Sequence, residues 1–238
     1  MTDPLFRDDA YLRSADGNVT RLTDEGGIVL DQTVFYPTGG GQPGDSGILT
    51  WDGGRIEIAT TIKGEGDEII LVPGEPAPLP SVGSVVRQEL DWERRHHHMR
   101  VHTALHLLSV VVPLPVTGGS ISEEKGRLDF DMEEAPEDKQ AIQDALNALV
   151  DRDLMVTTQW ISDEDLDANP GLVKTMSVKP PRGTGRVRLV RIGDTTEQVD
   201  LQPCGGTHVR STSEIGSVRI GKVEKKGRQN RRINLHID

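Results

Sequence analysis

The sequence predicts an α+β protein with a small β-barrel-like domain over residues 1–90 and a mixed domain over residues 91–238. The first ninety residues consist of short β-branched runs separated by Gly, Pro and Asp, a pattern typical of an all-β unit. Residues 91–238 alternate between helical and strand-like runs but lack the regular strand–helix–strand rhythm of a parallel sheet. We therefore expect helices and an antiparallel sheet in the second domain.

Four runs predict strands in the first domain, because each is rich in β-branched residues and bounded by turn formers. They are Ile28–Tyr36, Arg55–Ile62, Glu68–Val72 and Ser84–Leu90. The segment from Pro73 to Pro80 contains four prolines and is expected to be a stiff connector.

Three helices are predicted in the second domain. Asp91 is a suitable N-cap for a helix that runs to about Val112, because a proline follows there. A second helix is predicted over Pro136–Val150, since proline suits the first position and apolar residues recur on one face. Ser162 is expected to cap a short helix that ends at Ala168. Further strands are predicted at Arg127–Met132, Met155–Ile161, Arg186–Ile192, Glu197–Leu201, Ser217–Val223 and Arg232–Ile237.

Composition excludes several classes of protein. Of the 238 residues, 27% are charged and 34% hydrophobic, as in globular proteins, and only 3% are aromatic, too few for a broad base-stacking platform. The longest apolar run, Leu105–Val116, is interrupted and shorter than the about 20 residues that span a bilayer. Met1–Ala10 lacks the apolar segment of a signal peptide. We therefore expect a cytoplasmic protein with no membrane partner.

Charge is unevenly distributed along the chain, whose net charge is -11. Residues 1–169 contain 13 basic and 32 acidic residues, a net charge of -19, whereas residues 170–238 contain 14 and 6, a net charge of +8. A polyanion responds to charges within about 8 Å at physiological salt, so the basic part is a candidate surface for RNA. Electrostatic attraction between the acidic and basic parts of the chain explains this uneven distribution of charge as well as RNA binding does.

A histidine pair is the first candidate for chemistry. His102 and His106 lie four residues apart in the first predicted helix, so both imidazoles lie on one face and can bind one metal ion. Two partly buried histidines without a ligand role are the plain alternative. The metalloprotease pattern His-Glu-x-x-His needs a glutamate after the first histidine, and this chain has Thr103 there, which disfavours that class.

The second candidate contains Cys204, the single cysteine, which cannot form an internal disulfide. It is therefore a buried packing residue, a nucleophile or a metal ligand. It precedes His208 by four residues across two glycines, so the two side chains can converge. One thiolate and three imidazoles form a donor set that suits tetrahedral zinc. We therefore predict one Zn²⁺ per chain, bound by His102, His106, Cys204 and His208.

A glycine-rich run at Gly39–Gly47 is the third candidate. It lacks the Gly-Lys-Ser/Thr ending of a phosphate-binding loop, and on its own a turn is the better interpretation. We therefore expect no nucleotide cofactor.

Taken together, five motifs resemble the editing domain of alanyl-tRNA synthetase, in consistent order over nearly the whole chain. They stand at Gly40–Gly47, Arg100–His106, Gly119–Ser122, Arg127–Phe130 and Cys204–His208. With 238 residues and no room for an aminoacylation core, the chain resembles the free-standing AlaX editing proteins of medium length. The resemblance implies the editing-domain fold and hydrolysis of mischarged tRNA(Ala), chiefly seryl-tRNA(Ala), with glycine left open as a second amino acid.

The resemblance also implies roles for single residues. The family's zinc ligands fall on the four residues predicted above. Synthetases carry a glutamine shortly before the Gly-Ser motif, where this chain reads Val116-Thr117-Gly118-Gly119-Ser120, so Thr117 is the candidate that senses the serine hydroxyl. Further substrate contacts are expected from Ser120 and Gln42, and from the backbone N–H groups of Gly205, Gly206 and Thr207.

Contact with tRNA is expected from the densest basic patch, through Arg228, Arg231 and Arg232. The histidines that follow Arg94 and Arg95 are expected to lie in a solvated helix start, and Lys174-Thr175-Met176-Ser177 only weakly resembles a class I synthetase signature.

The expected reaction is hydrolysis of the aminoacyl ester by water at the zinc site, with no general base identified. Two rival functions remain: a zinc-dependent hydrolase of small esters or amides, and a noncatalytic RNA-binding module that zinc stabilises.

Overall fold

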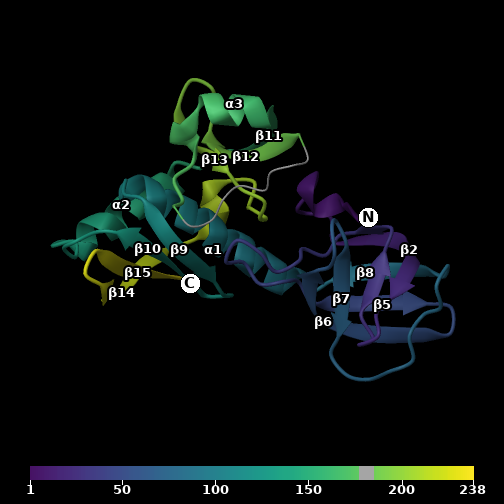
Figure 1. Cartoon of the computed structure of the whole chain (residues 1–238). Helices are drawn as coiled ribbons and strands as arrows, with labels where there is room; N and C mark the ends of the chain where they lie inside the picture. The colour runs from purple at the N-terminus through teal and green to yellow at the C-terminus, as the bar shows by residue number, and fades with distance from the viewer. Residues whose placement is uncertain (177–184) are drawn as a thin grey trace. The chain divides into compact units, whose positions relative to one another are not determined.

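The computed structural model describes residues 1–176 and 185–238, so Ser177 of the weak synthetase signature lies outside the described residues (Figure 1). The chain forms two compact units, Met1–His96 and His97–Asp238. A domain boundary after residue 90 stays a prediction. No helix in the described ranges is both long and apolar enough to cross a membrane.

The first unit is a closed barrel with the strand order β2-β3-β7-β6-β5-β8, which confirms the predicted barrel. Its strands are β2 (Ser14–Leu22), β3 (Ile28–Leu30), β5 (Gly47–Trp51), β6 (Gly54–Lys63), β7 (Ile69–Pro73) and β8 (Val85–Leu90). Two short strands, β1 (Asp3–Pro4) and β4 (Gln32–Thr33), pair in parallel beside the 3₁₀ turn η1 (Leu5–Arg7). The barrel encloses an apolar core that includes Phe35, Leu49 and Leu71.

One predicted strand of the barrel is wrong in length. Ile28–Tyr36 was expected to be continuous, but β3 ends at Leu30 and only Gln32–Thr33 pairs beyond it. The carboxylate of Asp31 accepts backbone N–H groups of Asn18 and Gln32, both at 2.8 Å, and so interrupts the ladder. Strands β2 and β5 were not predicted, because polar residues and glycines obscure their alternation.

The glycine-rich run begins with a tight turn, as predicted. Gly39 and Gln42 exchange backbone hydrogen bonds of 3.0 and 2.9 Å, and Gly40 and Gly41 between them have φ values of 58° and 84°. Two consecutive positive φ angles are the requirement of the two-residue hairpin turn that glycine satisfies best. The start of the run therefore supplies the backbone geometry of a tight turn.

A buried ion pair joins this run to the start of the first predicted helix. The guanidinium of Arg95 contacts the carboxylate of Asp45, and both side chains are at most 1% exposed. Arg95 also donates to the carbonyls of Ala10 at 3.0 Å and Val34 at 2.7 Å. The expectation of a solvated helix start is therefore wrong at this residue, and also at His98, which is 1% exposed.

We predict that Arg95→Met lowers the free energy of unfolding by about 3–5 kcal/mol, because it leaves a buried carboxylate without its counter-charge. Arg87→Met is the control, since the Arg87–Asp16 pair is exposed, and exposed pairs contribute about 1 kcal/mol or less. Urea denaturation measures both. Equal losses in the two variants would contradict a special role of the buried pair.

In the described part of the second unit, three helices and two antiparallel sheets are present, which confirms the α+β prediction. The helices are α1 (Trp92–Val111, which belongs to this unit from His97 on), α2 (Lys139–Asp151) and α3 (Asp163–Ala168). The larger sheet has the order β14-β15-β10-β9 and consists of β9 (Val116–Ile121), β10 (Lys125–Asp131), β14 (Val218–Gly227) and β15 (Asn230–Ile237). The smaller sheet consists of β11 (Val156–Ser162), β12 (Arg186–Gly193) and β13 (Gln198–Pro203), and two 3₁₀ turns lie at Pro170–Leu172 and Thr212–Ile215.

Predicted and observed elements differ here at two places, the start of the second helix and strand β9. The caps at Asp91 and Ser162 are confirmed, since their side chains accept the N–H groups of Arg94 and Asp165. The second helix begins at Lys139 and is capped by Asp138, because that carboxylate accepts the N–H of Ala141 at 3.0 Å. Strand β9 was missed, since its two central glycines resemble a loop.

The packing of α1 on the larger sheet determines which way its histidines face. A Cβ atom at Gly126 of β10 would lie 2.6 Å from Val101 and 3.1 Å from Leu105, so the helix approaches the strand closely there. Val101 and Leu105 form the face toward the sheet, and the adjacent face, one residue further on, carries His102 and His106.

Candidate metal centre

Four side chains of the second unit converge, and they are the four predicted ligands. One nitrogen from each of His102, His106 and His208 and the sulfur of Cys204 all lie within 4.8 Å of one another. His102 and His106 come from α1, and Cys204 and His208 come from the loop after β13. The three histidines are buried and the cysteine is half-buried.

The distances fit a tetrahedral ion. The Cys204 sulfur lies 3.3 Å from Nε2 of His208 and 3.5 Å from Nε2 of His102. Zinc–nitrogen bonds of about 2.0 Å and zinc–sulfur bonds of about 2.3 Å at a tetrahedral angle place sulfur and nitrogen roughly 3.5 Å apart. This donor set and this spacing could hold a metal ion.

Thr103 orients His208. Its hydroxyl donates to the carbonyl of Met99 at 2.9 Å, so toward Nδ1 of His208, 3.1 Å away, it can only accept. The proton of His208 is therefore on Nδ1, and the lone pair of Nε2 faces the cluster. Thr103 stands where a metalloprotease helix has its glutamate base, and here it positions a ligand.

Asp200 orients His106 from β13. Its Oδ2 atom lies 3.0 Å from Nδ1 of His106 and also accepts a hydrogen bond of 2.8 Å from the amide of Gln202. A carboxylate on the outer nitrogen of a ligating imidazole fixes the ring and increases its basicity. Nε2 of His106 is thereby directed toward the other three donors.

The loop that carries Cys204 is held by Arg188 of β12. The guanidinium of Arg188 donates to the carbonyls of Cys204 at 2.9 Å and Gly206 at 3.0 Å. The N–H of Gly206 turns inward to the Cys204 sulfur at 3.4 Å, whereas the N–H of Gly205 makes no hydrogen bond within the described ranges. Of the predicted N–H donors, that of Gly206 is thus engaged by the sulfur, and that of Gly205 has no partner among the described residues.

Electrostatics favour a thiolate in this cluster. Burial opposes ionisation of Cys204, but the adjacent His102 and His208 outweigh it and hold the pKa of the thiol well below its usual range. Burial and the charge of His102 lower the pKa of His208 to about 3, which keeps that imidazole neutral. A thiolate and a neutral imidazole are the forms in which these side chains bind metals.

The predicted serine-sensing residues Thr117 and Ser120 lie in strand β9. The hydroxyl of Thr117 donates to the carbonyl of Asp129 at 3.1 Å and accepts from the amide of Asn230 at 2.9 Å. Ser120 is half-buried in the same strand and lies opposite Arg127 of β10. Gln42 lies in the first unit and is fully buried, and Thr207 is buried too.

The predicted tRNA-binding arginines have different surroundings. Arg228 is exposed at the turn between β14 and β15. Arg231 is 7% exposed and donates to the carbonyls of Gly227 and Asn230, both at 3.0 Å. Arg232 forms two hydrogen bonds of 2.7 and 2.9 Å with Asp129. Internal contacts thus occupy two of the three guanidinium groups.

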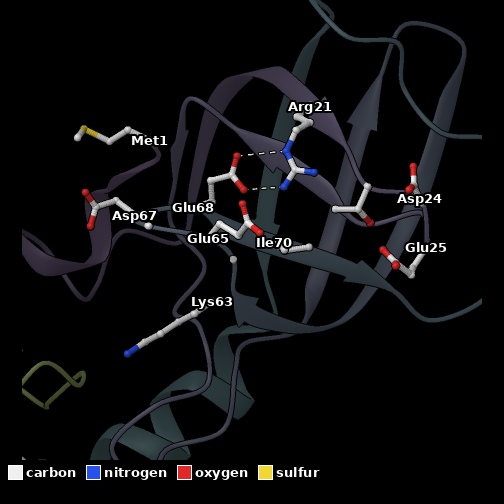
Figure 2. A pocket seen from close by; sticks show the side chains of 12 residues that line it. Met1, Arg21, Asp24, Glu25, Lys63, Glu65, Asp67, Glu68 and Ile70 are labelled. Carbon is white, nitrogen blue, oxygen red and sulfur yellow. Dashed lines mark hydrogen bonds and ion pairs between the residues drawn. The ribbon is translucent and has the colours of Figure 1, made fainter.

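A separate pocket of about 1030 Å³ lies in the first unit, and Figure 2 shows its charged lining. Arg21 forms a two-point ion pair with Glu68, at 3.1 and 2.6 Å. Four further carboxylates line the pocket, together with Lys63, and they belong to Asp24, Glu25, Glu65 and Asp67. Such a lining repels phosphates, which disfavours this pocket as an RNA site.

Two family models and several known proteins match this chain. The family model described as threonyl and alanyl tRNA synthetase second additional domain matches residues 187–234, and that for class II (A) tRNA synthetases matches residues 13–94. The alanyl-tRNA editing protein AlaX-M of Methanosarcina acetivorans is 35% identical over 98% of both chains. The alanine–tRNA ligase of Pyrobaculum neutrophilum is 35% identical over 94% of this chain but only 25% of its own.

Fold and matches thus define an editing module related to the aminoacyl-tRNA synthetases. AlaX-L of Pyrococcus horikoshii is a further relative, 33% identical over 99% of this chain and 58% of its own. The chain belongs to the AlaX family of alanyl-tRNA editing proteins.

We predict that the purified protein binds about one zinc ion per chain and that Cys204→Ala lowers this content well below one, because the substitution removes the single thiolate. Elemental analysis of the two proteins measures the effect. His236→Ala is the control, since His236 lies outside the cluster. Full zinc occupancy in Cys204→Ala would exclude Cys204 as a ligand.

Proposed function

We propose that the protein hydrolyses the aminoacyl ester of mischarged tRNA(Ala), chiefly seryl-tRNA(Ala), as a separate protein acting on released tRNA. The observation that carries the proposal is the convergence of His102, His106, Cys204 and His208 in a chain that matches editing proteins over nearly its full length. Its proposed compartment is the cytoplasm, where charged tRNA is used and a single cysteine stays reduced.

The metal proposed for the site is zinc, one ion per chain, because sulfur and nitrogen donors at these distances match its preferences. When bound, zinc supplies a Lewis acid that polarises an ester carbonyl. The protein's own contribution is geometric. Thr103 and Asp200 hold the protons of His208 and His106 on Nδ1, so that both Nε2 atoms remain ligands.

Stabilisation of negative charge is the second contribution of the chain. The open N–H of Gly205 is proposed to donate to the ester oxygen as it becomes an oxyanion, since backbone donors in a fixed loop need no reorganisation. Arg188 keeps that loop in place. An aminoacyl ester is already activated, so correct placement and modest stabilisation of the tetrahedral intermediate suffice.

Selectivity against alanine requires recognition of one hydroxyl. A pocket that hydrogen-bonds this group discriminates strongly, because alanine leaves the buried partner unpaired. The Thr117 oxygen donates its proton to Asp129, so toward a serine hydroxyl it acts as an acceptor. We propose Thr117 as this acceptor.

Contact with the tRNA backbone is proposed for the β14–β15 turn. Arg228 is the exposed guanidinium of the predicted set, and Lys222 and Lys225 are exposed on the same hairpin. Arg231 and Arg232 support the turn and strand beneath. This arrangement assigns phosphate contact chiefly to Arg228.

The proposed activity is tested by serine release from seryl-tRNA(Ala) and from a small serine ester, each with and without a chelator. We expect fast, chelator-sensitive release from the tRNA and much slower release from the small ester, because RNA contacts place the substrate. Alanyl-tRNA(Ala) should survive. Equal rates on both serine esters would favour a small-ester hydrolase, and RNA binding without hydrolysis would favour a noncatalytic module.

We predict that Thr117→Val slows seryl-tRNA(Ala) hydrolysis roughly 2- to 12-fold, the effect of losing one hydrogen bond of about 0.5–1.5 kcal/mol. Alanyl-tRNA(Ala) hydrolysis should stay low and zinc content unchanged. Thr117→Ser is the matched control, because it keeps the hydroxyl. Single-turnover rates on both tRNAs measure the effect, and an intact serine rate in Thr117→Val would transfer the sensing role to Ser120 or Gln42.

A further inference from the structure

Lys174 occupies a fixed place at the edge of the larger sheet. The carbonyl of Lys174 accepts the N–H of Val116 at 3.0 Å, and the N–H of Met176 donates to the carbonyl of Val116 at 2.8 Å. These two bonds form a parallel bridge between Thr175 and Val116, the first residue of β9. Lys174 is therefore aligned by the strand that carries Thr117.

The side chain of Lys174 reaches Asp200. The ammonium nitrogen lies 2.5 Å from Oδ1 of Asp200, whose side chain is fully buried, while the lysine side chain is 30% exposed. A buried carboxylate is costly unless a cation or several donors compensate it. Lys174 supplies the cation, and Gln202 donates to the other carboxylate oxygen at 2.8 Å.

The same carboxylate is the partner of a proposed metal ligand. Oδ2 of Asp200 lies 3.0 Å from Nδ1 of His106, so one carboxylate joins the lysine at one oxygen and the imidazole at the other. A continuous series of contacts thus leads from β9 through Lys174 and Asp200 to His106.

We propose that Lys174 is a positioning residue of the metal centre: it holds the carboxylate of Asp200 in place, and Asp200 holds the ring of His106 toward the other three donors. The proposal rests on the proposed function only in taking His106 as a ligand. It also gives β9 two tasks, because the strand that carries the serine-sensing candidate fixes the lysine that aligns a ligand.

The alternative is that Lys174 only fastens its segment to the smaller sheet. Under that alternative, its replacement lowers stability and leaves the metal centre unchanged. Under the proposal, its replacement changes affinity for the ion and the ligand geometry, even where the fold is intact. Metal binding therefore separates the two explanations without any measurement of deacylation.

The test titrates metal-free protein with Co²⁺ and records the thiolate-to-cobalt and ligand-field absorption bands. We expect Lys174→Met to weaken Co²⁺ binding roughly tenfold, at the lower end of the effects of residues that support a ligand, and to shift the ligand-field bands. Lys174→Arg should restore most of the affinity, because it keeps the charge. Lys125→Met is the matched control, since Lys125 is exposed and forms no ion pair with a described residue.

A double-mutant cycle makes the test specific to Asp200. In an Asp200→Asn background, Lys174→Met should change Co²⁺ affinity less than twofold, because the carboxylate through which the lysine acts is gone. Equal effects of Lys174→Met in both backgrounds, or wild-type affinity and spectrum in Lys174→Met, would overturn the proposal. Lys174→Gln replaces the methionine variant if the latter does not fold, as judged by circular dichroism.

Failure of this inference and failure of the proposed function give different results. If wild-type protein binds Co²⁺ but releases no serine from seryl-tRNA(Ala), the function is wrong and the cycle still decides the role of Lys174. If serine is released and the cycle is additive, the function stands and the lysine has no such role.

Discussion

The orientation of the imidazole rings of His106 and His208 is the constraint on which the candidate metal centre depends. A histidine binds a metal through one nitrogen only when the other nitrogen has a partner that fixes the proton and the ring. Thr103 is that partner for His208, and Asp200 is that partner for His106. The close contact of α1 with Gly126 and the pairing of β12 with β13 place the elements that carry these residues, and Lys174 contacts the other oxygen of Asp200.

The sequence was sufficient to predict the barrel, the α+β class and the approximate place of most strands, because β-branched runs and turn residues report local structure. Strand β9 was not predicted, because its two glycines remove the alternation of apolar and polar residues. The start of α2 was misplaced by a proline that lies before the cap at Asp138. Only the second difference arises from a specific side-chain contact, the cap that Asp138 forms.

The metal centre, too, could be predicted only in part from the sequence. Four candidate ligands could be named from spacing and residue type, and the structure brings them together. Asp200, Gln202 and Arg188 gave no signal, because their roles depend on the pairing of strands that are distant from α1 in sequence. Thr103 was visible inside the histidine motif, but its role became clear only from its two contacts, the Met99 carbonyl that accepts its proton and the His208 ring. Arg231 and Arg232 show the converse, since a basic run does not reveal which guanidinium groups are used internally.

The separation of the ligands along the chain has a consequence for folding. Cys204 and His102 are 102 residues apart, so an ion bound by both would cross-link the chain over a long loop. A covalent cross-link of this span removes about 4–5 kcal/mol of conformational entropy, expressed as free energy, from the unfolded ensemble. An ion bound to only one histidine pair would confer none of this. The second unit would therefore gain resistance to unfolding from the ion, whereas the barrel, which contributes no ligand, would gain none directly, and metal supply would become a control on how long the protein survives.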